Sequence, residues 1–73
     1  MKKIIKRYEV RNNIEVVIEE IYSAGHDDND FYVYGRQKIF FCWKQITLAE
    51  HEYNLEDAIE TAKRIKKQLL RLV

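Results

Sequence analysis

The chain has 73 residues, of which 47% are hydrophobic and 34% are charged, and its formal net charge is +1. A chain of this length can bury one small hydrophobic core, and its composition is too apolar for intrinsic disorder. We therefore expect residues 1–73 to form a single domain, without the high net charge that gives a protein a general affinity for polyanions.

Cysteine content and hydropathy favour a reducing compartment. Cys42 is the only cysteine, so one chain can form neither a disulfide nor a cysteine-based zinc cluster. The first apolar run, Ile4 and Ile5, is too short for a signal peptide, and no stretch reaches the roughly 18 uncharged apolar residues needed to span a bilayer. We expect a cytoplasmic protein with no membrane partner.

Residues 3–10 and 14–22 are rich in β-branched and aromatic residues that alternate with polar ones, as in strands with one buried face. They flank Asn12 and Asn13, and asparagine tolerates the positive φ that a two-residue hairpin turn requires. The pattern predicts a β-hairpin. In its second strand, three apolar side chains share one face: Ile14, Val16 and Ile18.

Residues 23–30 contain Gly25, three aspartates and an asparagine, a composition that predicts an exposed loop. Two aromatic segments follow, 31–34 and 38–48, separated by Gly35-Arg36-Gln37. Gly35 can form a turn or a bulge, so the pattern predicts two more strands. One long strand bent at Gly35 is the alternative.

The last segment has the pattern of an amphipathic helix that begins at Leu55. Asn54 is a favourable N-cap, Asp57 follows three residues later, and acidic residues lie at the positive end of the helix dipole. The apolar residues recur at helical spacing: Leu55, Ala58, Ile59, Ala62, Ile65, Leu69, Leu70 and Leu72. We expect an α+β fold, an antiparallel β-meander of three or four strands packed on one face by a C-terminal amphipathic α-helix.

This helix is expected to be longer than the strands that it covers. The end of the helix would then extend past the sheet, with Leu69, Leu70, Leu72 and Val73. Lys66 interrupts the apolar stripe, so either its aliphatic stem extends past the edge of the packed region or it already belongs to the part of the helix beyond the sheet. Because a second copy of the chain can cover exposed leucines, we expect a homodimer.

The polar clusters lack the spacing that catalysis or metal binding requires. The segment 26–30 contains oxygen ligands but not the spacing of an EF-hand, and His26, His51 and Cys42 form no zinc motif. Cys42 is expected to be a small buried residue. We expect no enzyme activity, no cofactor and no metal site.

Aromatic residues are the most distinctive feature of the chain. Alternation along the strands places two sets on opposite faces of the sheet. The inner set, expected in the core, contains Phe31, Val33, Phe40 and Cys42. The outer set contains Tyr32, Tyr34, Phe41 and Trp43. Since one helix covers one face, the outer set is expected to be a binding platform or an oligomer interface, unless the sheet curls and buries both sets.

These patterns favour a small non-enzymatic protein-binding module of the inhibitor or adaptor type, such as phages and mobile elements carry. Its partner would be another protein or a second copy of the chain. Aromatic and arginine side chains dominate such contacts. The expected contact residues are Tyr32, Tyr34, Arg36, Phe41, Trp43 and Lys44.

A nucleic-acid-binding module is the alternative, because bases can stack on exposed rings while basic side chains contact phosphates. The order of strands followed by a helix with Ala58 and Ala62 resembles the last part of a double-stranded-RNA-binding domain. Members of that family have an additional first helix and lysines at the start of the last helix. Here Glu56 and Asp57 occupy those positions, and both would repel phosphate.

Overall fold

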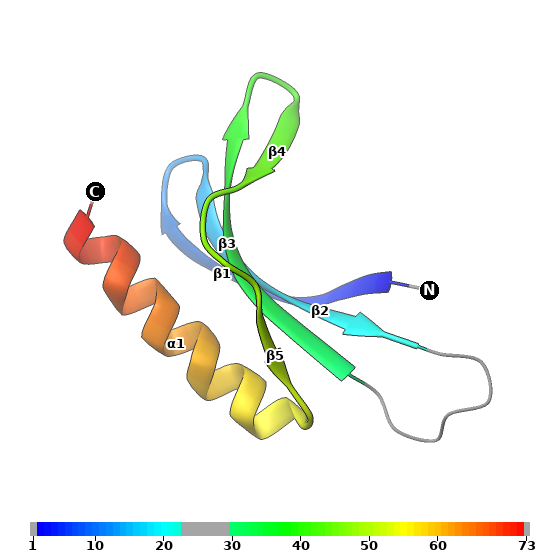
Figure 1. Ribbon diagram of the computed structural model, residues 1–73. Helices are drawn as coiled ribbons and strands as arrows, with labels where there is room; N and C mark the ends of the chain where they lie inside the picture. Colours follow the sequence, from blue (N-terminus) through cyan, green and yellow to red (C-terminus); the bar gives the residue numbers. More distant parts are fainter. Residues whose placement is uncertain (1, 23–29, 73) are drawn as a thin grey trace.

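The computed structural model describes residues 2–22 and 30–72. These residues form an antiparallel sheet packed against one helix, which confirms the expected α+β fold (Figure 1). In chain order the elements are β1 (Lys2–Arg11), β2 (Ile14–Ile21), β3 (Asp30–Ile39), β4 (Cys42–Gln45), β5 (Glu50–Glu52) and α1 (Leu55–Leu72). We call the side of the sheet that α1 covers the inner face and the opposite side the outer face.

The first predicted hairpin is confirmed. Arg11 of β1 pairs with Ile14 of β2, so Asn12 and Asn13 form a two-residue turn. Asn13 has a φ of 66°, and its carbonyl oxygen accepts a hydrogen bond from the Lys38 amide of β3 at 2.7 Å. The turn is therefore tied to the neighbouring strand as well as to its own hairpin.

The predicted turn at Gly35-Arg36-Gln37 is wrong, and the alternative of one strand through Gly35 is correct for residues 30–39, because β3 continues through these residues and pairs with β2 over residues 30–37. The glycine serves a different purpose. A Cβ atom at Gly35 would lie 2.7 Å from Leu69 Cδ1 and 3.1 Å from Thr47 Cγ2. Gly35 thus allows the helix to approach the centre of the strand closely.

The second hairpin turns at Phe40 and Phe41, within the segment 38–48 that was predicted to be one strand. Phe40 and Cys42 were predicted to be core residues, and this prediction is wrong. Phe40 is 90% exposed, and Cys42 is also exposed. Ile39 pairs with Cys42 across the turn, and this part of the hairpin extends beyond α1 (Figure 1). Among residues 2–22 and 30–72, no helix lies there to bury either residue.

Two short strands share the edge of β3 that β2 does not occupy. β4 pairs with residues 36–39 and β5 with residues 31–33. Between them, the Ile46 amide donates to the Gly35 carbonyl at 2.9 Å, and the Gly35 amide donates to Thr47 Oγ1 at 2.8 Å. β5 was not expected from the sequence, because Glu50-His51-Glu52 has little strand propensity.

The core lies between the inner face and α1. Its buried apolar residues are Ile14, Val16, Ile18, Phe31, Val33, Ala58, Ala62, Ile65 and Leu69. Most of these positions were predicted from periodicity. Val17 is also fully buried, although the register places it on the outer face opposite Arg7 and Tyr34. Side chains on the outer face therefore cover part of it without a second helix.

The predicted start of the helix is confirmed. The Asp57 amide donates to Asn54 Oδ1 at 2.8 Å, and Asn54 Nδ2 donates to Asp57 Oδ2 at 2.9 Å, a reciprocal cap. The predicted overhang is confirmed only at the last turn. Leu72 is 80% exposed and Leu70 is partly exposed, but Leu69 is buried in the core.

Some predictions fall on residues that the structure does not cover. Of the predicted loop 23–30, residues 23–29 lie outside the described residues, and Asp30 is the first residue of β3. The proposed roles of His26 in a metal site and of Val73 in the helix overhang also lie outside them.

Candidate functional site

The outer face of the sheet carries four of the six predicted contact residues. Every second residue of β3 points to the outer face, which includes Tyr32, Tyr34 and Arg36. Lys38 continues this row, and Trp43 of β4 pairs with Lys38 and therefore lies on the same face. Tyr32 and Tyr34 are half-buried, and Trp43 is 38% exposed. The outer row is thus neither fully exposed nor fully buried by curling of the sheet.

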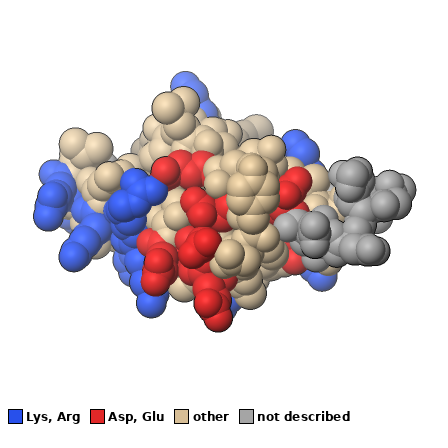
Figure 2. Space-filling view, turned by 60° about the horizontal axis from the view of Figure 1, so that its bottom comes forward, with Lys and Arg blue, Asp and Glu red and all other residues tan. Residues whose placement is uncertain are grey.

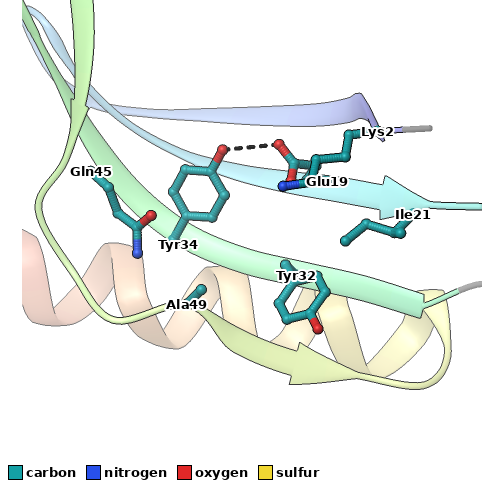
Figure 3. A pocket seen from close by; sticks show the side chains of 7 residues that line it. All are labelled: Lys2, Glu19, Ile21, Tyr32, Tyr34, Gln45 and Ala49. Atoms are coloured by element: carbon teal, nitrogen blue, oxygen red, sulfur yellow. Dashed lines mark hydrogen bonds between the residues drawn. The ribbon is translucent and has the colours of Figure 1, made fainter.

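A groove crosses this face beside the two tyrosines. Seven residues line it: Lys2, Glu19, Ile21, Tyr32, Tyr34, Gln45 and Ala49. We call it the outer groove, and its volume is about 460 Å³. Figure 3 shows the two tyrosine rings, which come from β3, together with side chains from strands on both sides of it. The lining combines apolar side chains with polar groups, as in sites that bind other molecules.

The Tyr34 ring is fixed in the outer groove by Glu19 of β2. The phenolic hydroxyl donates to Glu19 Oε2 at 3.2 Å (Figure 3). Burial raises the pKa of Tyr34, and the negative charge of Glu19 raises it further because it opposes a second negative charge nearby. Tyr34 therefore remains a neutral hydrogen-bond donor throughout the physiological pH range.

Trp43 is held in a similar way by Arg36. The guanidinium carbon of Arg36 lies 4.3 Å from the centre of the Trp43 ring, a cation–π contact. On its other side, Arg36 donates from Nε and Nη2 to Glu15 Oε2 at 3.0 and 2.7 Å. Because the Arg36 and Glu15 side chains are both largely buried, this arrangement fixes the orientation of the indole ring.

Tyr32 belongs to an aromatic stack that sequence reasoning missed. Its ring stacks on His51 of β5 at a centroid distance of 4.9 Å. The rings of His51 and Tyr53 form a T-shaped pair with a centroid distance of 4.7 Å. His51 Nε2 also lies 3.3 Å from Asp30 Oδ1. The missing signal was β5: without that strand, nothing in the sequence places residues 51 and 32 side by side.

A second, smaller hollow surrounds Trp43 on the same face. Its lining residues are Arg7, Glu9, Arg11, Asn13, Ile14, Glu15, Lys38 and Trp43. The three cations suit an anionic ligand, but the two glutamates oppose one. Glu15 is already paired with Arg36, and Arg7 Nε lies 3.9 Å from the same carboxylate oxygen.

The other two predicted contact residues lie apart from this face. Phe41 is in the second hairpin turn and is 94% exposed, so its expected position on the outer face is wrong. Lys44 is exposed on β4 opposite Gln37, on the side of the hairpin that corresponds to the inner face. The structure therefore separates the predicted site into the outer groove with Trp43 and the projecting hairpin tip.

Side chains that could bind a metal are dispersed over residues 2–22 and 30–72. No group of three or more histidine, cysteine, aspartate and glutamate side chains comes together there. Within the same residues, no helix has the length and hydropathy to cross a membrane.

Comparisons of the chain with protein-family models, with curated proteins and with solved structures give no match.

Proposed function

We propose that this chain is a small non-enzymatic protein-binding module that binds its partner through the outer groove and Trp43. The observation that carries the proposal is the way in which the rings are held. Tyr32 stacks on His51, Tyr34 donates a hydrogen bond to Glu19, and Trp43 lies against Arg36. All three rings are partly exposed yet fixed by a neighbour.

Fixed rings favour binding because little conformational entropy remains to be lost when a partner orders them. Tyrosine, tryptophan and arginine are also the residue types that contribute most to protein interfaces. The outer groove has hydrogen-bonding groups at Glu19, Gln45 and Lys2 beside the rings, so a polypeptide can satisfy its polar groups there. These features support a protein partner over a purely apolar small molecule.

Photo-crosslinking in the cells that produce the protein tests this proposal. We expect p-benzoylphenylalanine at position 32 to form one dominant covalent adduct with a protein, identified by mass spectrometry. The matched control carries the same probe at Leu48, which is 89% exposed but lies beside Ile65 and Gln68 of α1. An adduct at twice the mass of the chain would identify a second copy as the partner.

The Trp43→Ala variant adds an independent criterion. Removal of the indole should weaken the adduct formed from position 32, because the two rings belong to one contact face. Identical adducts from positions 32 and 48, or an unchanged yield in Trp43→Ala, would contradict the proposal.

The second candidate is nucleic-acid binding, which the cations around Trp43 favour. Arg7, Arg11 and Lys38 line the hollow where a base could stack on the indole. This candidate predicts binding of a labelled single strand with an affinity that falls steeply as salt rises. Absence of an anisotropy change at low salt would exclude it, and Glu9 and Glu15 in the same hollow make that the expected result.

A further inference from the structure

The tip of the β3–β4 hairpin is the most exposed apolar feature of the described residues. Phe40 and Phe41 form its turn and are 90% and 94% exposed. The hairpin projects from the body of the molecule, away from the helix that covers the rest of the inner face (Figure 1). Neither phenylalanine belongs to the core, so their burial does not stabilise the fold.

The backbone at the tip also opposes a purely structural role. Phe40 has a φ of 57°, a left-handed conformation that favours glycine or asparagine and costs a bulky residue about 1 kcal/mol or more. The only other non-glycine residue with positive φ in the described chain is Asn13, which suits that conformation. A bulky side chain in such a position is better explained by a contact outside the chain than by folding.

Polarity changes in order along this hairpin. The two phenylalanines lie at the tip, the partly exposed Ile39 lies directly behind them, and the pair of Lys38 and Trp43 follows. Lys38 pairs with Trp43 on the outer side, whereas Lys44 pairs with Gln37 on the inner side, so cations flank the tip on both sides. Lys38 lies two positions before Phe40 and Lys44 lies three positions after Phe41, which is about 7 Å and about 10 Å along an extended strand.

The same order of polarity occurs in the surface of an anionic bilayer. Apolar side chains of interfacial proteins reach roughly 5–10 Å into the boundary between headgroups and acyl chains, and tryptophan favours the headgroup level. Lysines then contact anionic headgroups. A protein pocket would not require cations on both sides of the tip, whereas a planar anionic surface contacts both.

Acidic and basic side chains are separated along α1. Residues 55–62 of α1 include Glu56, Asp57 and Glu60, and residues 63–72 include Lys63, Arg64, Lys66, Lys67 and Arg71. Figure 2 shows acidic side chains in the middle of this side of the molecule and basic ones at the end where the second half of α1 lies. In Figure 1 the hairpin tip lies at the top, the C-terminal end of α1 lies at the left, and β5 lies below both.

We infer that the β3–β4 hairpin tip inserts Phe40 and Phe41 into the surface of an anionic lipid bilayer, with Lys38 and Lys44 against the headgroups. This contact does not span the membrane, and it differs from the expectation of no membrane partner, which considered spanning segments alone. The outer groove lies farther down β3 and is not used by the tip. Trp43 belongs to both proposed contacts, but serine at positions 40 and 41 leaves Trp43 and the outer groove unchanged, so failure of this inference and failure of the proposed protein-binding function can be told apart.

Trp43 is the only tryptophan of the chain and lies beside the tip, so its fluorescence reports insertion directly. We expect a blue shift of its emission, and co-flotation of the protein, with vesicles of phosphatidylcholine and phosphatidylglycerol. Vesicles of phosphatidylcholine alone should bind at least about tenfold more weakly, since they lack anionic headgroups. Lys38→Gln with Lys44→Gln should remove most of this preference.

The decisive variant is Phe40→Ser with Phe41→Ser, which should reduce the partition into anionic vesicles by about tenfold or more. Leu48→Ser is the matched control, because it also removes an exposed apolar side chain but lies beside α1. Circular dichroism verifies the fold of each variant. If the wild type fails to bind anionic vesicles, or if the double serine variant binds as the wild type does, the inference is overturned and a protein pocket becomes the remaining occupant for the tip.

Discussion

The β1–β2 and β3–β4 hairpins both turn through two residues, but the turns differ in composition and surroundings. In the first, Asn13 has positive φ and accepts a hydrogen bond from the Lys38 amide. In the second, Phe40 has positive φ, and both phenylalanines are almost wholly exposed. One turn thus has the residue type that its backbone favours, and the other does not.

The strands behind the turns differ in the same sense. Directly after the first turn, β2 supplies Ile14, Val16 and Ile18 to the core. Around the second turn, residues 38–45 supply none. The first hairpin can therefore be explained by folding alone. The residues of the second are better explained by binding, which makes the two hairpins suitable for direct comparison by mutation.

The largest difference is expected between a core position of the first hairpin and the tip of the second. Ile18→Ala should lower the free energy of unfolding by about 3 kcal/mol, because it creates a cavity at a fully buried site. Phe41→Ala should change it by less than about 0.5 kcal/mol. Urea denaturation measures both values, and a large loss for Phe41→Ala would show that the tip is packed after all.

A smaller effect is expected where the two hairpins are joined by Glu15 of β2 and Arg36 of β3. Glu15→Ala should destabilise the fold by about 2 kcal/mol, because it leaves a largely buried guanidinium without its carboxylate. The matched control is Glu50→Ala, which removes an exposed ion pair with Arg64 and should cost less than about 1 kcal/mol. Equal losses in the two variants would contradict the assigned difference in burial.

A residue that suits positive φ should stabilise the β3–β4 turn. Phe40→Gly should raise the free energy of unfolding by about 1 kcal/mol, since glycine has no steric penalty at positive φ. In a domain of this size that corresponds to a melting temperature higher by roughly 4–8 °C. Phe41→Gly is the control and should not stabilise, because Phe41 does not have positive φ. A lower melting temperature for Phe40→Gly would argue against strain at this residue.

The smallest effect concerns Tyr34, on the part of β3 below the projecting tip. Its pKa is raised in the folded state above the ordinary value of 10.0, first by burial and then by Glu19. The folded protein therefore binds the phenolic proton more tightly, and this contribution to stability is complete below pH 10.0 and is lost as pH rises through the folded pKa.

Ultraviolet titration of tyrosinate should thus show a late-ionising phenol that is absent in Tyr34→Phe. The difference between these two titrations is needed because Glu20 also raises the pKa of the exposed Tyr22. In Glu19→Gln the pKa of Tyr34 should be lower than in the wild type but still raised, because burial remains. Ionisation of Tyr34 at the ordinary value in the wild type would contradict its packing in the outer groove.

Local patterns predicted the parts of the fold that local physics controls. The alternation in β2, the Asn12-Asn13 turn and the cap at Asn54 all depend on residues close together in sequence, and all are confirmed. The same alternation placed Tyr32 and Tyr34 on the outer face. Alternation could not predict the contacts of each ring, because Glu19 beside Tyr34 and His51 beside Tyr32 belong to other strands.

The errors have one physical source. Gly35 was interpreted as a residue of a turn or a bulge, but it is needed because Leu69 of the helix approaches the strand there. Phe40 was assigned to the core by alternation, but the chain turns at Phe40 and Phe41, which have poor turn propensity, beyond the reach of α1. In both cases a contact, or the lack of one, between distant segments outweighed the local signal.

The sequence by itself determined the fold class, the first hairpin and the extent of the helix, because short-range periodicity and capping specify them. Only the tertiary structure decided between a turn and a continuous strand at Gly35, placed His51 of β5 beside Tyr32, and left two phenylalanines projecting from the fold. The reason is that burial depends on where the single helix ends relative to the sheet, and no local pattern contains that distance.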